Sequence, residues 1–224
     1  QHPVMKMTTP IPENRTTPKK VKTSIGTLEF FDGVPIGNTK ERLYDFVDRG
    51  RAVEVFINMT PAASMYSLRQ GHRDLGLTES NQILIAEQLG DSKPLVLTWN
   101  NTSLYAWGFL DLKRDGPTVI ELPPDVLGIL DDMYFRYISD MGAAGPDKGK
   151  GGKYLVLPPG YEGDVPDGYY VVKSKTYGVW NFMRGYVRGN VQDPANIKKA
   201  ADNIKKNLKV YPLAKKDNPP KMEF

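Results

Sequence analysis

The stretch LVLTWNNTSLYAWGFLDLKRDGPTVIELPP, residues 95–124, decides the fold class. After the polar residues 100–103, apolar and aromatic residues fill almost every position, with Tyr105, Trp107 and Phe109 at alternate places. Successive side chains of a β-strand point to opposite faces, so a strand here is apolar on both faces. We therefore expect a β-rich domain in which this strand is covered on each side.

Further runs of this kind follow, and turn residues separate them at the intervals of an antiparallel sheet. Asp115-Gly116 is a strong turn pair and predicts a hairpin between SLYAWGFLDL and PTVIELP. Earlier in the chain, IGTLEFFDGVPIG predicts a short strand that is closed by Asp32-Gly33. The other expected strands lie within LVLTW, DMYFRYISDM, KYLVLPP, GYYVVKSKT and YGVWNFMRGYVRG.

Residues 39–76 change to the period of an α-helix. Thr39 is a suitable N-cap at the start of this segment. Pro61 lies inside it and should divide it into two or three helices, because proline removes a helical hydrogen bond. The apolar residues that recur at helical spacing are Leu43, Phe46, Val47, Val53 and Phe56.

A last helix is expected at residues 193–208, where Asp193 suits the N-cap and Pro194 the first helical position. The sequence as a whole predicts an α+β fold. We expect an antiparallel β-sandwich, built mainly from residues 95–190, with the N-terminal helices packed on it and this C-terminal helix.

The two ends of the chain differ from its middle in composition. Residues 1–24 hold four prolines among threonines and lysines, and they predict an extended N-terminal arm. Residues 25–208 are expected to form a single α+β domain. Residues 209–224 carry three prolines and four lysines, which is typical of a linker. Because Tyr211 and Phe224 in this tail are apolar, we expect it to lie extended across an interface.

The composition excludes several classes of partner. The chain has no cysteine, so it forms no disulfide and has no thiolate nucleophile. The net charge of +4 is mild and no patch interleaves basic with aromatic residues, so we expect no nucleic-acid groove. No apolar run approaches the roughly 20 residues of a membrane span, so we expect none.

We also expect no metal and no cofactor. The histidines are His2 and His72, and no metal-binding motif contains either of them. The glycine-rich loop GPDKGKGGK runs into a strand and lacks the spacing of a phosphate-binding loop, so we interpret it as a mobile hairpin loop. Asp131 and Asp132 are adjacent, and on a strand they would point to opposite faces.

The polar interruption before the central strand is the first candidate site. Tyr105 and Trp107 share one face of that strand, and they are either core residues or one wall of a pocket. In the second interpretation Asn100 and Asn101 lie at the rim and offer amide donors and acceptors. The core interpretation is the more common one for such residues.

Arg136 and Arg184 form the second candidate group, because each interrupts an otherwise apolar strand. An unpaired charge there would be costly, so each arginine should pair with a carboxylate such as Asp140, Asp131 or Glu121. A structural ion pair is the common outcome; recognition of an acidic ligand is the alternative.

Three functions remain open. We favour binding of a small ligand in an aromatic-lined cleft. The alternatives are a hydrolase, in which Asp131 or Asp140 meets a tyrosine only in the fold, and a structural subunit of a homo-oligomer. Perturbed carboxylates in a deep pocket would favour the enzyme, and large apolar surfaces would favour the assembly.

The order of the long blocks resembles domain-of-unknown-function family 1254. The blocks are RAVEVFINMTPAASMYSLRQG, LVLTWNNTSLYAWGFLDLKRDGPTVIELPP, GPDKGKGGKYLVLPPGYEGDVPDGYYVVKS and VYPLA, between about residues 25 and 215. The family is mostly bacterial and commonly exported, with relatives in large viruses.

The resemblance implies architecture more than activity. It implies a second, β-rich C-terminal domain as a partner, which would follow near NPPKMEF, and it draws attention to Asn100 and Asn101 within an asparagine-rich block. It also implies export to the periplasm or the cell exterior. A chain that begins with Gln1 would suit a mature exported protein.

Overall fold

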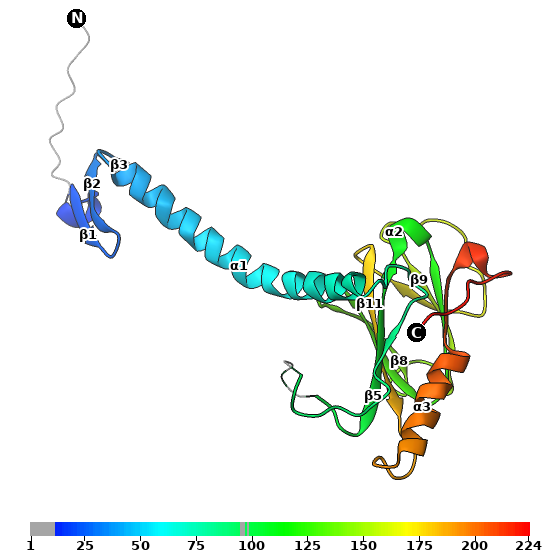
Figure 1. The fold of residues 1–224 in the computed structure, drawn as a ribbon. Helices are drawn as coiled ribbons and strands as arrows, with labels where there is room; N and C mark the ends of the chain where they lie inside the picture. The colour runs from blue at the N-terminus through cyan, green and yellow to red at the C-terminus, as the bar shows by residue number, and fades with distance from the viewer. Residues whose placement is uncertain (1–11, 95–96, 98) are drawn as a thin grey trace, which may run out of the picture. The chain divides into compact units, whose positions relative to one another are not determined.

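The computed structural model describes residues 12–94, 97 and 99–224 (Figure 1). The chain divides into two compact units, Gln1–Met59 and Thr60–Phe224, and the boundary falls within one helix. Most of the predicted strand LVLTW (Leu95, Val96 and Thr98) lies outside the described residues. So does the start of the predicted arm, with His2.

The first unit contains a small antiparallel sheet. Its strands are β1 (Lys20–Thr23), β2 (Gly26–Phe31) and β3 (Val34–Pro35), preceded by a short 3-10 helix, η1 (Glu13–Arg15). Asp32 and Gly33 join β2 to β3 with φ angles of 46° and 81°, the left-handed values that a tight hairpin needs. The predicted turn is therefore confirmed.

The helix α1 (Thr39–Asp74) is continuous, so the prediction that Pro61 divides it is wrong. Proline inside a helix costs about 3 kcal/mol. The many helical turns on both sides of Pro61 offset this cost, because helix formation is cooperative. The helix ends before Gly76, whose φ of 83° breaks the helical path. Thr39 does not cap its own helix: its Oγ1 accepts a hydrogen bond from the Glu29 backbone N–H at 2.8 Å.

The second unit is built around a five-stranded antiparallel sheet. The order is β4 (Leu84–Ile85), β5 (Ser103–Asp111), β11 (Gly178–Tyr186), β7 (Val126–Asp132), β8 (Tyr137–Gly142). The pairing of β5 with β11 covers all nine residues of each strand, from Ser103 opposite Tyr186 to Asp111 opposite Gly178. The strand predicted within residues 95–124 is thus β5, which lies inside this sheet with a neighbour on each side.

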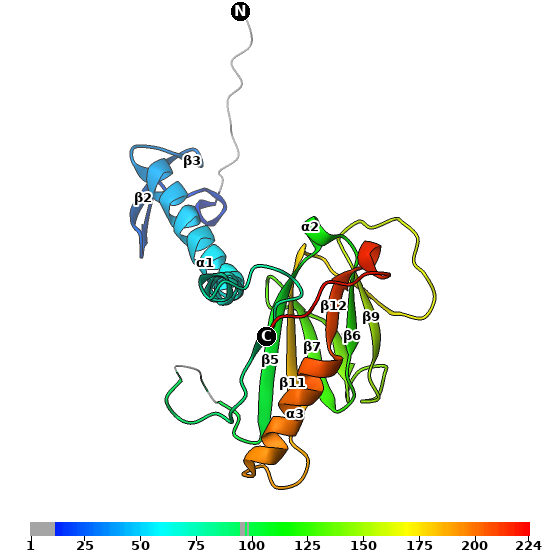
Figure 2. The same ribbon diagram turned by 45° about the vertical axis from the view of Figure 1, so that its right-hand side comes forward.

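A second, four-stranded sheet packs against the first (Figure 2). Its order is β10 (Tyr170–Lys173), β9 (Gly152–Leu157), β6 (Thr118–Leu122), β12 (Lys209–Pro212). Only β9 and β10 pair in parallel among the described strands. The antiparallel sandwich predicted from the sequence is therefore present, with one parallel pair at its edge.

The core lies between the two sheets and contains fully buried side chains from both. Leu104 and Leu110 come from β5 and Met183 from β11, while Ile120 and Tyr154 come from the opposite sheet. The helix α3 (Pro194–Asn207) lies across the opening between β5 and β12 (Figure 2) and adds its own buried residues to this core. Those residues are Ala200, Ala201 and Ile204.

The start of α3 follows the prediction closely, since the Asp193 carboxylate accepts a hydrogen bond from the Ala195 N–H at 2.9 Å. The hairpin predicted at Asp115-Gly116 is wrong. A short helix, α2 (Leu112–Asp115), takes its place, and the chain crosses from one sheet to the other. Asp111 caps this helix by accepting from the Arg114 N–H, which turns the chain away from β5.

The strand predicted in DMYFRYISDM is also misplaced. Its first residues form a turn between β7 and β8, and β7 itself was not predicted. Asp132 holds this turn, because its carboxylate accepts from the backbone N–H groups of Tyr134 and Arg136. A side chain that binds its own backbone in this way favours a turn over a strand.

The C-terminal segment belongs to the sandwich. Val210 and Tyr211, expected in a tail, are buried in β12, and a short 3-10 helix, η2 (Leu213–Lys215), follows. Further on, the Ile83 N–H donates to the Glu223 carbonyl and the Glu223 N–H donates to the Asn81 carbonyl. Apolar tail residues are thus covered from within the chain.

Asp147 anchors the glycine-rich loop, which the sequence predicted to be mobile. Its buried carboxylate accepts hydrogen bonds from the Gly142 N–H at 2.7 Å, the Gly151 N–H at 3.0 Å and the Tyr154 hydroxyl. These bonds tie both ends of the loop to the strand β9. The loop is therefore a structural element of the sandwich.

We predict that Asp147→Ala lowers the free energy of unfolding by about 2–4 kcal/mol, because three donors, two of them buried, lose their acceptor. Urea unfolding followed by circular dichroism measures this change. Asp167→Ala removes an exposed aspartate from the next loop and serves as the matched control. Equal stability of the two variants would contradict this role of Asp147.

Candidate functional site

The outer face of the five-stranded sheet carries a regular array of side chains. The strand register places Tyr105, Arg184 and Leu127 in one row across β5, β11 and β7. The next row contains Trp107, Phe182 and Ile129, and it continues to Asp140 on β8. The third row contains Phe109, Trp180 and Asp131. These residues point away from the core because they alternate with inward-facing ones.

Aromatic rings form a continuous series on this face. Phe182 lies at the centre, with its ring centroid 5.1 Å from Tyr105, 6.5 Å from Trp107 and 4.6 Å from Trp180. Trp99 extends the series beyond β5, at 5.3 Å from Tyr105. The Tyr105 side chain is buried, with 7% exposed, whereas the Trp107 and Phe182 side chains are half-buried.

Arg184 is the cation of the first of these rows, and its guanidinium lies over the Tyr105 ring at 5.3 Å from the centroid. Within the described part of the chain, no carboxylate oxygen lies within 4.0 Å of its nitrogens. The carboxylate partner expected from the sequence is therefore not found there. A half-buried arginine without such a partner keeps its capacity to bind an anion.

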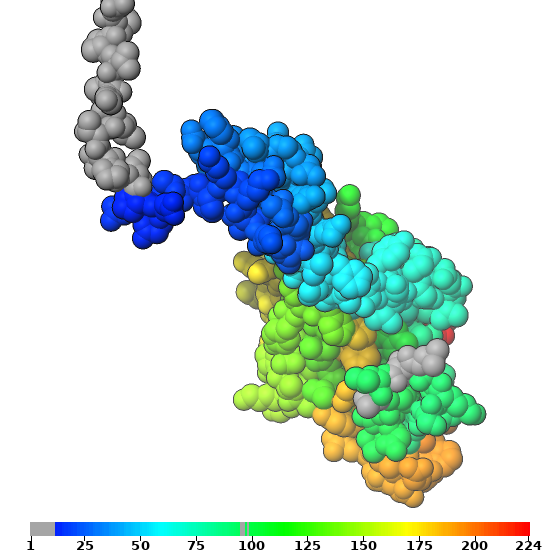
Figure 3. Space-filling model, turned by 90° about the vertical axis from the view of Figure 1, so that its left-hand side faces the viewer, coloured from blue at the N-terminus to red at the C-terminus, as the bar shows by residue number. Residues whose placement is uncertain are grey.

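A hollow of about 250 Å³ adjoins Arg184. In Figure 3, part of β11 is visible in gold between the yellow-green β7 and β8 and the green residues ahead of β5. Asp140 on β8 also lines this hollow, and the Asp140 carboxylate accepts a hydrogen bond from the Tyr137 hydroxyl at 3.3 Å. The lining residues are Leu127, Gly128, Ile129, Asp140, Phe182 and Arg184.

Asp131 is the most perturbed carboxylate on this face. It is 5% exposed and lies opposite Trp180, whose indole Nε1 is buried without a hydrogen-bond partner among the described residues. Burial raises the pKa of the Asp131 carboxyl above its ordinary value, and the negative charges of Asp132 and Asp140 raise it further. Asp131 therefore ionises less readily than an ordinary aspartate.

Phe135 is a residue that the sequence did not single out. Its φ of 58° is unusual for a bulky residue, and its ring lies 5.6 Å from Trp180 although the side chain is 53% exposed. The turn that holds it is fixed by Asp132, as described above. Strained backbone of this kind is concentrated at binding sites. We therefore add Phe135 to the residues of the aromatic series that are candidates for ligand contact.

His72 closes the far end of the face. This histidine lies in the last turn of α1 and is buried against Phe109, with ring centroids 5.4 Å apart. Burial lowers the pKa of this imidazole, so it stays neutral at physiological pH. The last turns of α1 therefore pack on the sheet through a neutral aromatic contact.

The remaining sequence candidates lie apart from the hollow. Asn100 fixes a turn, because its Oδ1 accepts from the Thr102 N–H at 2.7 Å and from the Ser103 N–H at 3.2 Å. Asn101 lines a separate hollow with Trp99. Arg136 pairs with Asp132 at 2.7 Å and lies over Tyr134 in the β7–β8 turn. The structure thus unites Tyr105, Trp107 and Arg184 and separates Asn100, Asn101 and Arg136 from them.

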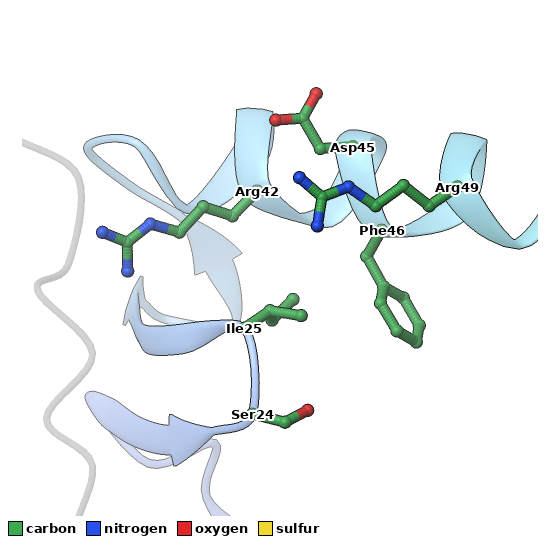
Figure 4. A pocket seen from close by; sticks show the side chains of 6 residues that line it. All are labelled: Ser24, Ile25, Arg42, Asp45, Phe46 and Arg49. Carbon is green, nitrogen blue, oxygen red and sulfur yellow. The ribbon is translucent and has the colours of Figure 1, made fainter.

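Another hollow, of about 320 Å³, lies within the first unit (Figure 4). Ser24 and Ile25 border it from the β1–β2 turn, and Arg42, Asp45, Phe46 and Arg49 border it from α1. Arg42 already donates to the Thr27 carbonyl at 3.2 Å, and most of these side chains are exposed. This hollow therefore lacks the enclosed polar groups that a ligand site needs.

Two kinds of feature are absent from the described residues. No group of three histidine or acidic side chains comes together there as a metal site requires. No helix in the described ranges combines the length and the apolar character needed to cross a membrane.

We predict that Asp131→Asn stabilises the protein at neutral pH by about 1 kcal/mol, or about 2–4 °C in Tm. The folded-state pKa of Asp131 is raised, so its ionisation weakens the fold as the pH rises through that pKa. The gain should be present at pH 7 and vanish below the ordinary aspartate pKa. Thermal unfolding across pH measures it, with Asp140→Asn as a comparison that should give a smaller gain. A gain that grows at low pH would contradict the prediction.

Comparison with known proteins agrees with this architecture. The family described as protein of unknown function (DUF1254) matches residues 80–212. A comparison with curated proteins found no match. The crystal structure of the VPA0106 protein from Vibrio parahaemolyticus is similar in fold, with a TM-score of 0.54 and 16% identity over 75% of this chain. The match covers 39% of that chain, so the present chain spans well under half its length. Since the family match covers more than half of the 224 residues, the chain belongs to the DUF1254 family.

Proposed function

We propose that the second unit binds a small ligand on the outer face of its five-stranded sheet. The observation that carries this proposal is Arg184, a cation without a carboxylate partner among the described residues, beside a hollow on an aromatic surface. Aromatic rings provide apolar contact, and a single charged group provides orientation. Tyr105, Trp107, Phe182 and Arg184 are the residues to which we assign this binding.

A hydrolase is the weaker alternative. Asp140 does meet a tyrosine, Tyr137, and Asp131 has a raised pKa. However, Tyr137 lies exposed on the edge strand β8, and Asp131 does not line the hollow. A general acid or base must reach the reacting atoms, so this arrangement supports binding better than hydrolysis.

We further propose that the unit acts in an exported protein beside a second, C-terminal domain. Membership of the family supports both parts, and the greater length of the VPA0106 protein supports the second. The ligand-binding face of the second unit would then lie beside this C-terminal domain.

The chain's tryptophans make the ligand proposal testable. All three, Trp99, Trp107 and Trp180, belong to the aromatic series, so a ligand there should change the intrinsic fluorescence. We predict that hits from a library of small acids, amines and amino acids shift this emission. Phe182→Leu should weaken their binding by about tenfold, because it removes the central ring.

The matched control is Tyr169→Leu, which removes a ring that packs with the four-stranded sheet and should leave binding unchanged. Hits that bind without changing the emission, or with equal affinity to the Phe182→Leu variant, would sink the proposal.

A second candidate function, that of a subunit in a homo-oligomer, is favoured by α1. Phe46, Val53 and Ile57 are exposed on this helix, and together with Leu43 and Gly50 they follow a heptad pattern. A helix with such an exposed apolar stripe needs a covering partner. In a parallel pair of copies, Arg49 of one helix would also face Glu54 of the other, which favours a second copy as that partner.

We predict that the protein is a dimer or larger assembly by light scattering, and that Ile57→Glu dissociates it by placing a charge in the stripe. Val55→Glu is the control, because Val55 is exposed on another side of the same helix and should tolerate the charge. A monomeric wild-type protein would refute the assembly.

A further inference from the structure

We propose that the ligand of the hollow between β7, β8 and β11 is a small zwitterion, whose anionic group binds Arg184 and whose cationic group binds Asp140. This inference rests on the proposed ligand-binding function and specifies its ligand. Phe182, Leu127 and Ile129 would contact the apolar body of the ligand between the two charges.

The first support is the position of the two charges. Arg184 lies opposite Leu127 on β7, and Asp140 lies opposite Ile129, two residues further along that strand. From the spacing of strands and residues in a sheet, their Cα atoms lie about 12 Å apart. They line the same hollow but do not form an ion pair with each other. Opposite charges are thus held on the two sides of one apolar patch.

The second support is that both charges are poorly satisfied by the protein. Arg184 contacts the Tyr105 ring, and Asp140 accepts a long hydrogen bond from Tyr137. By contrast, Arg136 on the neighbouring turn is bound by the Asp132 carboxylate at 2.7 Å. A half-buried charge is costly when it lacks a partner, so a ligand with complementary charges would recover this cost at both ends.

The third support is size. The hollow of about 250 Å³ lies below the roughly 300–1,000 Å³ of pockets that hold drug-sized ligands. It suits a molecule of amino-acid size with a short apolar body. The separation of Arg184 from Asp140 further favours a ligand whose two charged groups are several bonds apart.

The test uses matched probes and calorimetry. The zwitterion is 5-aminopentanoate, whose two charges are several bonds apart, and the analogues with one charge are pentanoate and pentylamine. We expect this zwitterion to bind about tenfold more tightly than both of its analogues. Arg184→Gln should reduce that zwitterion to the affinity of its amine analogue, and Asp140→Asn to the affinity of its carboxylate analogue.

Arg136→Gln is the matched control, because this arginine is already paired with Asp132 and should leave binding unchanged. Circular dichroism and thermal unfolding verify that each variant is folded. If the analogues with one charge bind as tightly as the zwitterion and shift the tryptophan emission, the face binds ligands but the zwitterion is wrong. If no probe of either kind binds, the proposal that the ligand is a zwitterion is wrong. The ligand-binding function itself is then tested by the library screen alone.

Discussion

The nine-residue pairing of β5 with β11 is the constraint on which the rest of the second unit depends. These strands lie next to each other in the sheet, and each carries mostly apolar residues on both faces. The inner face contributes Leu104 and Met183 to the sandwich core, which fixes the position of the second sheet and of α3. The arrangement of the side chains on the outer face is then fixed as well. The register that aligns the core also aligns Tyr105 with Arg184 and Trp107 with Phe182.

Local chemistry explains which parts of the fold could be predicted from the sequence. The alternation of β5 and the capped start of α3 depend on neighbouring residues, and both are confirmed. The continuity of α1 through Pro61 could not be predicted, because it depends on the helix as a whole outweighing one local cost. The Asp115-Gly116 turn was misread for a related reason. Asp111 starts a short helix there, and β5 finds its partner in a strand far along the chain.

The candidate site shows the same division. Tyr105, Trp107 and Arg184 were identified as alternating residues on apolar strands, but the pairing that unites them is a property of the sheet. Asn100 was placed at a pocket rim, yet its side chain satisfies the turn that follows it. Phe135 could not be found by pattern, because its significance lies in a positive φ that only the three-dimensional turn reveals. The local hydrogen bonds of polar residues beside a strand should therefore be considered before such residues are assigned to a ligand site.

Three local costs lie on the outer face of the five-stranded sheet. Arg184 lacks a carboxylate partner within the described residues, Asp131 has a raised pKa and Phe135 has a strained backbone. Four buried side-chain polar atoms lack a hydrogen-bond partner among the described residues: one each in His72 and Trp180 at the outer face, and two in Asn181 in the core. These atoms therefore do not distinguish the outer face from the core. If stability were the only requirement, other residues would be expected at the positions of Arg184, Asp131 and Phe135, because each of these residues lowers the stability of the fold relative to an available alternative. Their concentration on one face, over a core that can offset them, is what a surface shaped for binding would show.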